Sequence, residues 1–358
     1  MDSNITFFLG ANSPSGFYSL YDQMIDPQRA RRIFLLKGGA GCGKSSLMRR
    51  VAQTLAQAGE DVEYITCSGD PDSLDAVVFH NLGAAIVDAT APHIMEPSLP
   101  GVVESYVNLG RFYDHEALAT LREEIEGATK GYKSHYKRAY HCLMAAAQLR
   151  EDDRTLLLTP AREEKMARRA KGILSREVKK TGREPGRVVQ RFLGAVSCQG
   201  VSCRFDTAEA LCPKIYELCD SYGLGAGMLT TLCAGIMAAG YDAILCPSPL
   251  FPDRAEHLLV PELGLGFVTS TPALPYTGRP YRRVRLDAMV DPELARTYKA
   301  RLKFARKVFQ SLLDQAVDAL AQAKAEHDVL EKLYNPHVDF EGVYAQADAV
   351  AGELLAIR

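Results

Sequence analysis

Residues 33–45, IFLLKGGAGCGKS, contain the pattern that decides the fold: a short apolar run, a glycine-rich loop, and a lysine followed by a serine. The apolar run at 33–37 predicts a buried strand. The segment from Gly38 to Ser45, here called the glycine loop, satisfies the phosphate-binding pattern GxxxxGK[ST]. Apolar residues at helical spacing follow it, from Leu47 to Leu55. A strand, a glycine loop and a helix in this order are the context that a phosphate-binding loop (P-loop) requires.

The residue types of the glycine loop suit a nucleotide triphosphate. Glycines let backbone amides approach phosphate oxygens, and the helix N-terminus adds partial positive charge. We expect Lys44 to reach the β- and γ-phosphates as a catalytic residue, and the Ser45 hydroxyl to take one Mg²⁺ position. The predicted nucleotide-binding residues are Gly38, Gly39, Ala40, Gly41, Cys42, Gly43, Lys44, Ser45 and Ser46.

A second metal ligand is expected at the end of another apolar strand. Residues 83–88, GAAIVD, predict such a strand, and its last residue, Asp88, has the arrangement of a Walker B aspartate that holds Mg²⁺ and supports catalysis. The alternative is that Asp88 caps the turn before Thr90.

Three aspartates cluster after the strand predicted at 62–67. Of Asp70, Asp72 and Asp75, Asp70 is nearest the strand, so it is the candidate catalytic base or support for the metal shell. Helix capping by Asp72 or Ser73 is the competing interpretation. His93 is expected to be a surface histidine.

The second part of the chain repeats the first. FLGANSPSG at 8–16 and FLGAVSCQG at 192–200 share six of nine residues. Near the same offset the glycine loop falls on DSYGLGAGML, residues 220–229, where Ala226 replaces Lys44. Ser45 becomes Gly227, and Asp88 becomes Thr269. We expect the second copy to keep its core without the chemistry, and its uncharged helix at 228–239 to lie in a buried interface with the first copy.

These patterns predict an α/β protein of two tandem P-loop NTPase-like domains, residues 1–185 and 186–358, the second of them degenerate. Each domain is expected to hold a parallel sheet flanked by helices, with a helical insertion or lid at 114–183 and at 291–334.

The chain resembles a family of bacterial tandem P-loop proteins described as ATPase-like or nucleotide-kinase-like. The resemblance covers essentially the whole chain, although family members often carry a usable loop in both halves. It implies the tandem fold and leaves the reaction open. The segments that carry it are FLGANSPSGFYSLYD, KGGAGCGKS, CSGDPDSLDAV, VDATAPH and HDVLEKLYNPHVDFEGV.

Composition narrows the cellular setting. A net charge of −2 argues against nucleic acid as a partner, and the absence of an export signal and of a membrane span predicts a cytoplasmic protein. The uncharged stretch at 221–241 is interpreted as a helix buried in protein. The nine cysteines are expected to be reduced and mostly buried; a zinc site from Cys198, Cys203, Cys212 and Cys219 is the alternative.

The basic stretch at 162–191 is interpreted as a solvated helix face. A nucleic-acid contact is the alternative, and an arginine from this stretch, or Arg279, Arg282 or Arg283, is a candidate to stabilise a transferring phosphoryl group.

No asparagine is followed by lysine, so the guanine-binding NKxD pattern is absent and Mg·ATP is the expected ligand. The predicted function is an ATPase or an ATP-driven switch with one site, in the first half. The alternatives are a phosphotransferase with Asp70 as base, and a non-catalytic ATP sensor whose second half binds a partner.

Overall fold

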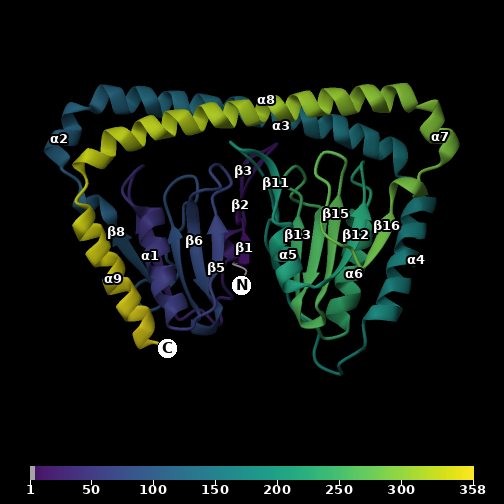
Figure 1. Ribbon diagram of the computed structural model, residues 1–358, viewed down its shortest axis with the longest axis horizontal. Helices are drawn as coiled ribbons and strands as arrows, with labels where there is room; N and C mark the ends of the chain where they lie inside the picture. The colour runs from purple at the N-terminus through teal and green to yellow at the C-terminus, as the bar shows by residue number, and fades with distance from the viewer. Residues whose placement is uncertain (1–4) are drawn as a thin grey trace.

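The computed structural model describes residues 5–358, which form two sheet-bearing halves lying side by side (Figure 1). The first half has a six-stranded sheet. Its strands, in spatial order, are β1 (Ile5–Phe7), β5 (Glu63–Thr66), β6 (Leu74–Phe79), β7 (Ala84–Asp88), β4 (Arg32–Lys37) and β8 (Glu104–Asn108).

The second half repeats this order strand for strand. Its sheet runs β9 (Val188–Gln190), β13 (Ala243–Pro247), β14 (Ala255–Val260), β15 (Leu265–Ser270), β12 (Lys214–Cys219) and β16 (Arg282–Arg285). Each half also has a hairpin: β2 (Gly10–Ser13) with β3 (Gly16–Ser19), and β10 (Gly194–Ser197) with β11 (Gly200–Cys203). The internal repeat read from the sequence is therefore a repeat of topology.

The alignment of the two copies is confirmed at the positions that matter for the site. Leu36 of β4 pairs with Asp88, and Leu218 of β12 pairs with Thr269. The helix after the first loop, α1 (Lys44–Gln57), begins at the lysine, and α6 (Ala226–Ala238) begins at the alanine that replaces it.

The prediction of parallel sheets is wrong, because both sheets are mixed. Strand β6 runs antiparallel to β5 and to β7, whereas β1, β4 and β8 pair in parallel with their neighbours. A parallel connection needs a crossover of a dozen or more residues. The chain between β6 and β7 is only the short turn η2 (His80–Leu82) and Gly83, whose φ of +63° favours glycine, so the chain reverses there.

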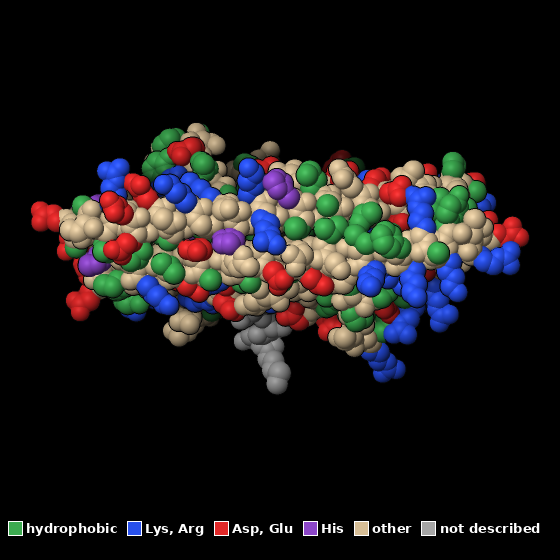
Figure 2. Space-filling view, turned by 90° about the horizontal axis from the view of Figure 1, so that it is seen from above, with side chains coloured by type: hydrophobic (Ala, Val, Ile, Leu, Met, Phe, Trp, Pro, Cys, Tyr) green, Lys and Arg blue, Asp and Glu red, His purple; other side chains and the backbone are tan. Residues whose placement is uncertain are grey.

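Two long helices cross both halves. The first half is followed by α2 (His115–Thr120), α3 (Arg122–Leu157) and α4 (Pro160–Glu177), and the second by α7 (Pro292–Thr297), α8 (Lys299–Tyr334) and α9 (Phe340–Ala356). Helices α3 and α8 pack along each other and run over the tops of both sheets (Figure 1). On their outer face, acidic and basic side chains are interspersed (Figure 2).

The helices at the two ends of the molecule are exchanged between the halves. Each long helix has 36 residues, a length of about 54 Å, and so carries the chain from one half to the other. Helix α4 then packs on α6 of the second half, and α9 packs on α1 of the first. The predicted boundary at 185/186 thus separates the two sheets but not the helices that cover them.

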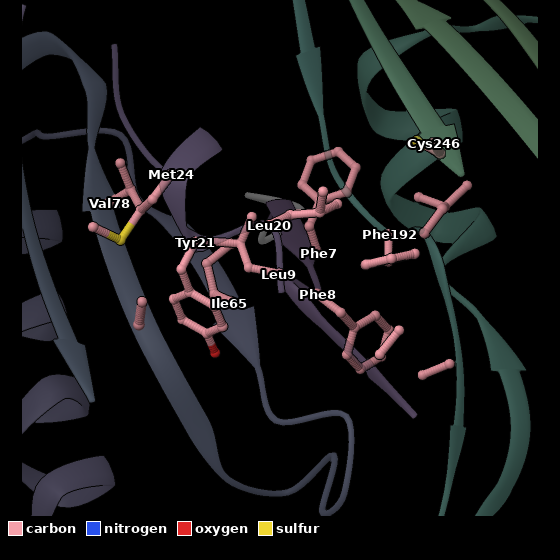
Figure 3. Packing of buried hydrophobic residues seen from close by; sticks show 14 of the residues in the cluster. Phe7, Phe8, Leu9, Leu20, Tyr21, Met24, Ile65, Val78, Phe192 and Cys246 are labelled. Atoms are coloured by element: carbon pink, nitrogen blue, oxygen red, sulfur yellow. The ribbon is translucent and has the colours of Figure 1, made fainter. Parts of the chain in front are cut away.

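Equivalent residues of the repeat meet at the centre of the molecule. Phe8 and Phe192 exchange two backbone hydrogen bonds of 2.9 and 2.8 Å, and the Asn12 amide donates to the carbonyl of Val196. Around them lies a buried apolar cluster from both halves, including Phe7, Leu9 and Phe192 (Figure 3). The halves therefore pack on each other about an approximate twofold axis.

Two expectations about buried groups are corrected here. Helix α6 is buried between its own sheet and α4, on the side away from the first sheet, because the exchange of α4 covers it there. Arg191 is not solvated: its guanidinium is buried and lies 2.6 Å from a carboxylate oxygen of Glu63, across the boundary between the halves. None of the helices described here is long and apolar enough to cross a membrane.

Candidate functional site

The glycine loop joins β4 to α1 in a conformation that depends on two glycines. Gly41 and Gly43 have φ values of +67° and +84°, which an L side chain rarely adopts. Helix α1 buries Leu47, Met48 and Val51 against the sheet, so the loop is held at both ends. Within the loop Ala40 is half-buried, Cys42 is buried, and Ser46 is exposed on the first turn of the helix.

Lys44 and Asp88 are brought together as expected. The Lys44 Nζ lies 3.6 Å from Asp88 Oδ2, and both side chains are largely buried. Nζ also donates to the carbonyl oxygens of Gly38 and Gly39, at 2.8 and 2.7 Å. The pair forms because β4 and β7 are parallel neighbours, which places the residues after both strands at the same edge of the sheet.

The Asp88 carboxylate does two things at once. Its Oδ1 accepts hydrogen bonds from the backbone N–H (2.9 Å) and the hydroxyl of Thr90, while Oδ2 faces Lys44. Asp88 therefore caps the turn before Thr90 and also lies beside Lys44. Ser45 Oγ accepts a hydrogen bond from the Leu74 N–H at 3.0 Å. A serine hydroxyl and a carboxylate are oxygen ligands of the kind that Mg²⁺ takes, so the donor chemistry fits that ion.

The end of α8 covers the glycine loop. A Cβ atom added to Gly41 would lie 2.5 Å from the side-chain amide of Asn335 and 3.1 Å from the backbone of Glu331. With its amide oriented to donate, Asn335 bonds the Gly41 carbonyl at 2.6 Å. The Gly39 N–H donates to the Tyr113 hydroxyl at 2.7 Å. One loop N–H, the kind of group that binds phosphate, and one loop carbonyl are thus bonded to residues far away in the sequence.

Asp70 faces the long helix α8 and lies apart from the contact between Lys44 and Asp88. Among residues 5–358 its side-chain contacts are the Asp72 N–H at 3.2 Å and Lys324 Nζ of α8 at 3.4 Å, and none of them joins it to Lys44, Ser45 or Asp88. Asp72 in turn accepts a hydrogen bond from Gln199 of the second half, at 2.7 Å.

His93 is buried, which corrects the expectation of a surface histidine. Its Nε2 lies 3.3 Å from Asp75 Oδ2, which also accepts a hydrogen bond from the Tyr21 hydroxyl at 2.9 Å. Its ring packs edge-on against Phe17, with centroids 4.9 Å apart. No local pattern around His93 predicts this arrangement, because Tyr21 and Phe17 come from a segment far upstream.

The Asp75–His93 contact favours the charged forms of both groups. Burial opposes ionisation of each, but the attraction between them outweighs it, so the pKa of His93 is raised and that of Asp75 is lowered. The charges of Asp88 and Lys44 also act on His93, in opposite directions. His93 therefore lies within electrostatic reach of Lys44 and Asp88.

The second loop is arranged around a carboxylate of its own. Asp220, which aligns with Gly38, is buried and accepts hydrogen bonds from the N–H groups of Tyr222, Leu224 and Gly225, at 3.1, 3.0 and 2.7 Å. Burial raises its pKa, although the three amides oppose the rise. The φ of Gly225 is −76°, unlike that of Gly43. Amides that would surround a phosphate here bind Asp220 instead.

The zinc site given as the alternative for the cysteines is not assembled among residues 5–358. The nine cysteines are free thiols, four of them buried. Across residues 5–358 the metal-compatible group found is His327, Asp328 and Glu331 on α8, and it includes none of Cys198, Cys203, Cys212 or Cys219.

Comparison with known proteins gives one family match. A family model described as "Nephrocystin 3, N-terminal" matches residues 18–91, less than half of the chain but including every predicted site residue. No match was found among curated proteins. None was found among solved structures. The class that the fold defines is thus an α/β protein with two mixed-sheet halves, and the match is a hint of similarity for the segment that holds the glycine loop.

Proposed function

We propose that the first half binds Mg·ATP at the glycine loop, and that the chain is an ATPase or an ATP-driven switch with a single such site. One contrast supports the proposal. Lys44 and Asp88 lie 3.6 Å apart after adjacent parallel strands, whereas the equivalent residues of the second half are Ala226 and Thr269. The second loop also binds its own Asp220.

In this proposal each residue has a defined part. Loop amides and Lys44 bind the phosphate oxygens, which requires Lys44 to leave the carbonyls of Gly38 and Gly39. Ser45 and Asp88 would hold Mg²⁺, which neutralises phosphate charge when it is bound. The Gly39 N–H must leave the Tyr113 hydroxyl to reach a phosphate oxygen, so binding of ATP would loosen the contact of Tyr113 with the loop.

The test is the affinity for ATP, measured by calorimetry with and without Mg²⁺. Lys44→Ala removes a charge-assisted contact and is expected to weaken binding about 10- to 100-fold. The control is Lys171→Ala, which removes an exposed lysine from α4 and should leave the affinity unchanged. If Lys44→Ala binds ATP as tightly as wild type, or if cross-linked ATP maps to residues 220–227, the proposal fails.

A second measurement on the same proteins, the products formed from ATP, tells hydrolysis from phosphoryl transfer. Phosphate release from ATP without an added acceptor supports hydrolysis. ADP formation that requires a nucleoside, nucleotide or sugar would assign phosphoryl transfer instead, and Asp70→Asn should then abolish it. Binding without turnover would assign a sensor.

A further inference from the structure

A cavity of about 540 Å³ lies at the edge of the second sheet, under the long helices. It is lined by the segments that follow β12, β13 and β15, and is closed from above by α3 and α8. In the repeat this edge corresponds to that of the glycine loop in the first half. The volume falls within the range of small-molecule sites, roughly 300–1,000 Å³.

One wall of the cavity is apolar. Phe309 and Leu313 are buried residues of α8, and Leu250 and Phe251 come from the segment after β13. Aromatic and aliphatic side chains of this kind bind the body of a small ligand by removing its surface from water.

Two arginines lie over these aromatic rings. The Arg150 guanidinium of α3 lies 4.1 Å from the centroid of the Phe309 ring, and that of Arg254 lies 4.5 Å from the Phe251 ring. Of the five N–H donors of Arg150, one donates to the Ser221 carbonyl at 2.6 Å.

The two arginines differ in how their charge is balanced. Arg254 lies 2.5 Å from a carboxylate oxygen of Glu151, which also contacts Arg154 at 3.4 Å. No ion pair with Arg150 is found in the described part of the chain, 5–358. Burial lowers the pKa of Arg150, although the charges of Asp153 and Asp220 oppose the shift, so its charge is held in a poorly solvated place. A desolvated cation without an ion pair favours an anionic ligand.

The charges of Asp153 and Asp220 reach Arg150, but among residues 5–358 neither carboxylate forms an ion pair with it. Asp220 is occupied by three backbone amides of its own loop. Burial, with the nearby Asp220 charge, raises the pKa of Glu256 to about 7. Asp314 and Asp318 are exposed residues of α8.

We propose that this cavity binds a small organic anion, a carboxylate or a phosphate on an apolar or aromatic body, with Arg150 receiving the anionic group. Phe251 and Phe309 contact the body. The site is separate from the proposed ATP site, which lies in the other half, so either can be tested without the other.

The test uses four probes that share a phenylalkyl body: 3-phenylpropionate, 2-phenylethylphosphonate, 3-phenylpropanol and 3-phenylpropylamine. Calorimetry on the full chain is expected to give a Kd below about 1 mM for at least one anion, with the alcohol and the amine at least tenfold weaker. The stronger of the two anions distinguishes a carboxylate ligand from a phosphate ligand.

Variants locate the binding. Arg150→Gln is expected to reduce the affinity for the anion at least tenfold, whereas Arg122→Gln, an exposed arginine of the same helix, should not change it. Val201→Trp changes a half-exposed residue of β11 and places a large ring in the cavity, so it should abolish binding. This second variant tests the proposal independently if Arg150→Gln disturbs the fold. The proposal is overturned if neither anion binds, if the amine binds as tightly as the anions, or if Val201→Trp leaves binding intact.

Discussion

Asp220 stands in the second loop where Gly38 stands in the first. Its carboxylate accepts three backbone N–H bonds, so the loop is completed by an anion that belongs to the chain. Gly223 and Gly225 are kept at the positions of Gly41 and Gly43 although no lysine follows them, and the backbone between them folds around a negative charge of its own. The sequence contains this substitution at the repeat offset, but a glycine-to-aspartate change carries no structural meaning until the amides are seen to face the carboxylate.

Also at the residue scale, the contact between Asp75 and His93 makes the free energy of unfolding depend on pH. The folded-state pKa of His93 is raised above its ordinary value of 6.5, so the pairing stabilises fully below that pH and is lost as pH rises through the folded-state pKa. His93→Gln is therefore expected to lower the free energy of unfolding by about 1–3 kcal/mol near pH 6, and by much less near pH 9. Urea unfolding followed by circular dichroism at the two pH values measures this.

The control for that prediction is His115→Gln, which removes an exposed histidine from α2. Its unfolding curve should match wild type at both pH values. An effect of His93→Gln that is equal at the two pH values would show that the ring contributes packing alone.

At the scale of elements, local patterns predicted the strands and helices around the glycine loop. Strand β4, helix α1 and strand β7 have apolar periodicity and turn residues that are complete within about fifteen residues each. The mixed sheet and the exchange of α4 and α9 could not be predicted in this way. The sheet is mixed because the chain reverses at the short turn between β6 and β7, and an apolar run does not tell a parallel strand from an antiparallel one. The exchange depends on which half a helix reaches after a 36-residue crossing, and both halves offer similar apolar surfaces. The cover over the loop, Tyr113 and Asn335, was missed for the same reason.

The exchange makes α9 a part of the first half, and one leucine tests it. Leu354 is fully buried in the cluster that contains α1, so Leu354→Ala is expected to cost about 2–5 kcal/mol. In hydrogen exchange the loss of protection should appear in α1, at 44–57, and not in α6. Leu355→Ala, at the neighbouring position that is 37% exposed, is the matched control and should change little. Loss of protection in α6 instead would contradict the exchanged packing.

At the scale of the whole molecule, the contacts that join the two halves include the central apolar cluster, the exchanged helices, and the buried ion pair of Glu63 and Arg191. Although burial opposes ionisation of Glu63, Arg191 and His80 outweigh it and lower its pKa to about 2. Arg191 also donates to the backbone carbonyls of Gln23 and Met24, at 2.7 and 2.9 Å. One side chain of the second half thus organises a strand and a turn of the first.

We therefore expect the halves to unfold together, and Arg191→Met tests this. The substitution leaves Glu63 buried without its main partner, which typically costs about 3–5 kcal/mol, and the double variant Glu63→Gln with Arg191→Met should recover part of that loss. Hydrogen exchange in rising urea is the measurement, with α1 reporting on the first half and α6 on the second. In wild type both helices should lose protection at the same urea concentration. In Arg191→Met they should lose it together at a lower concentration. The reason is that each half is covered by a helix that follows the other sheet in the chain. If α6 opened well before α1 in either protein, the halves would be independent units and the exchanged helices would contribute little to the coupling between them.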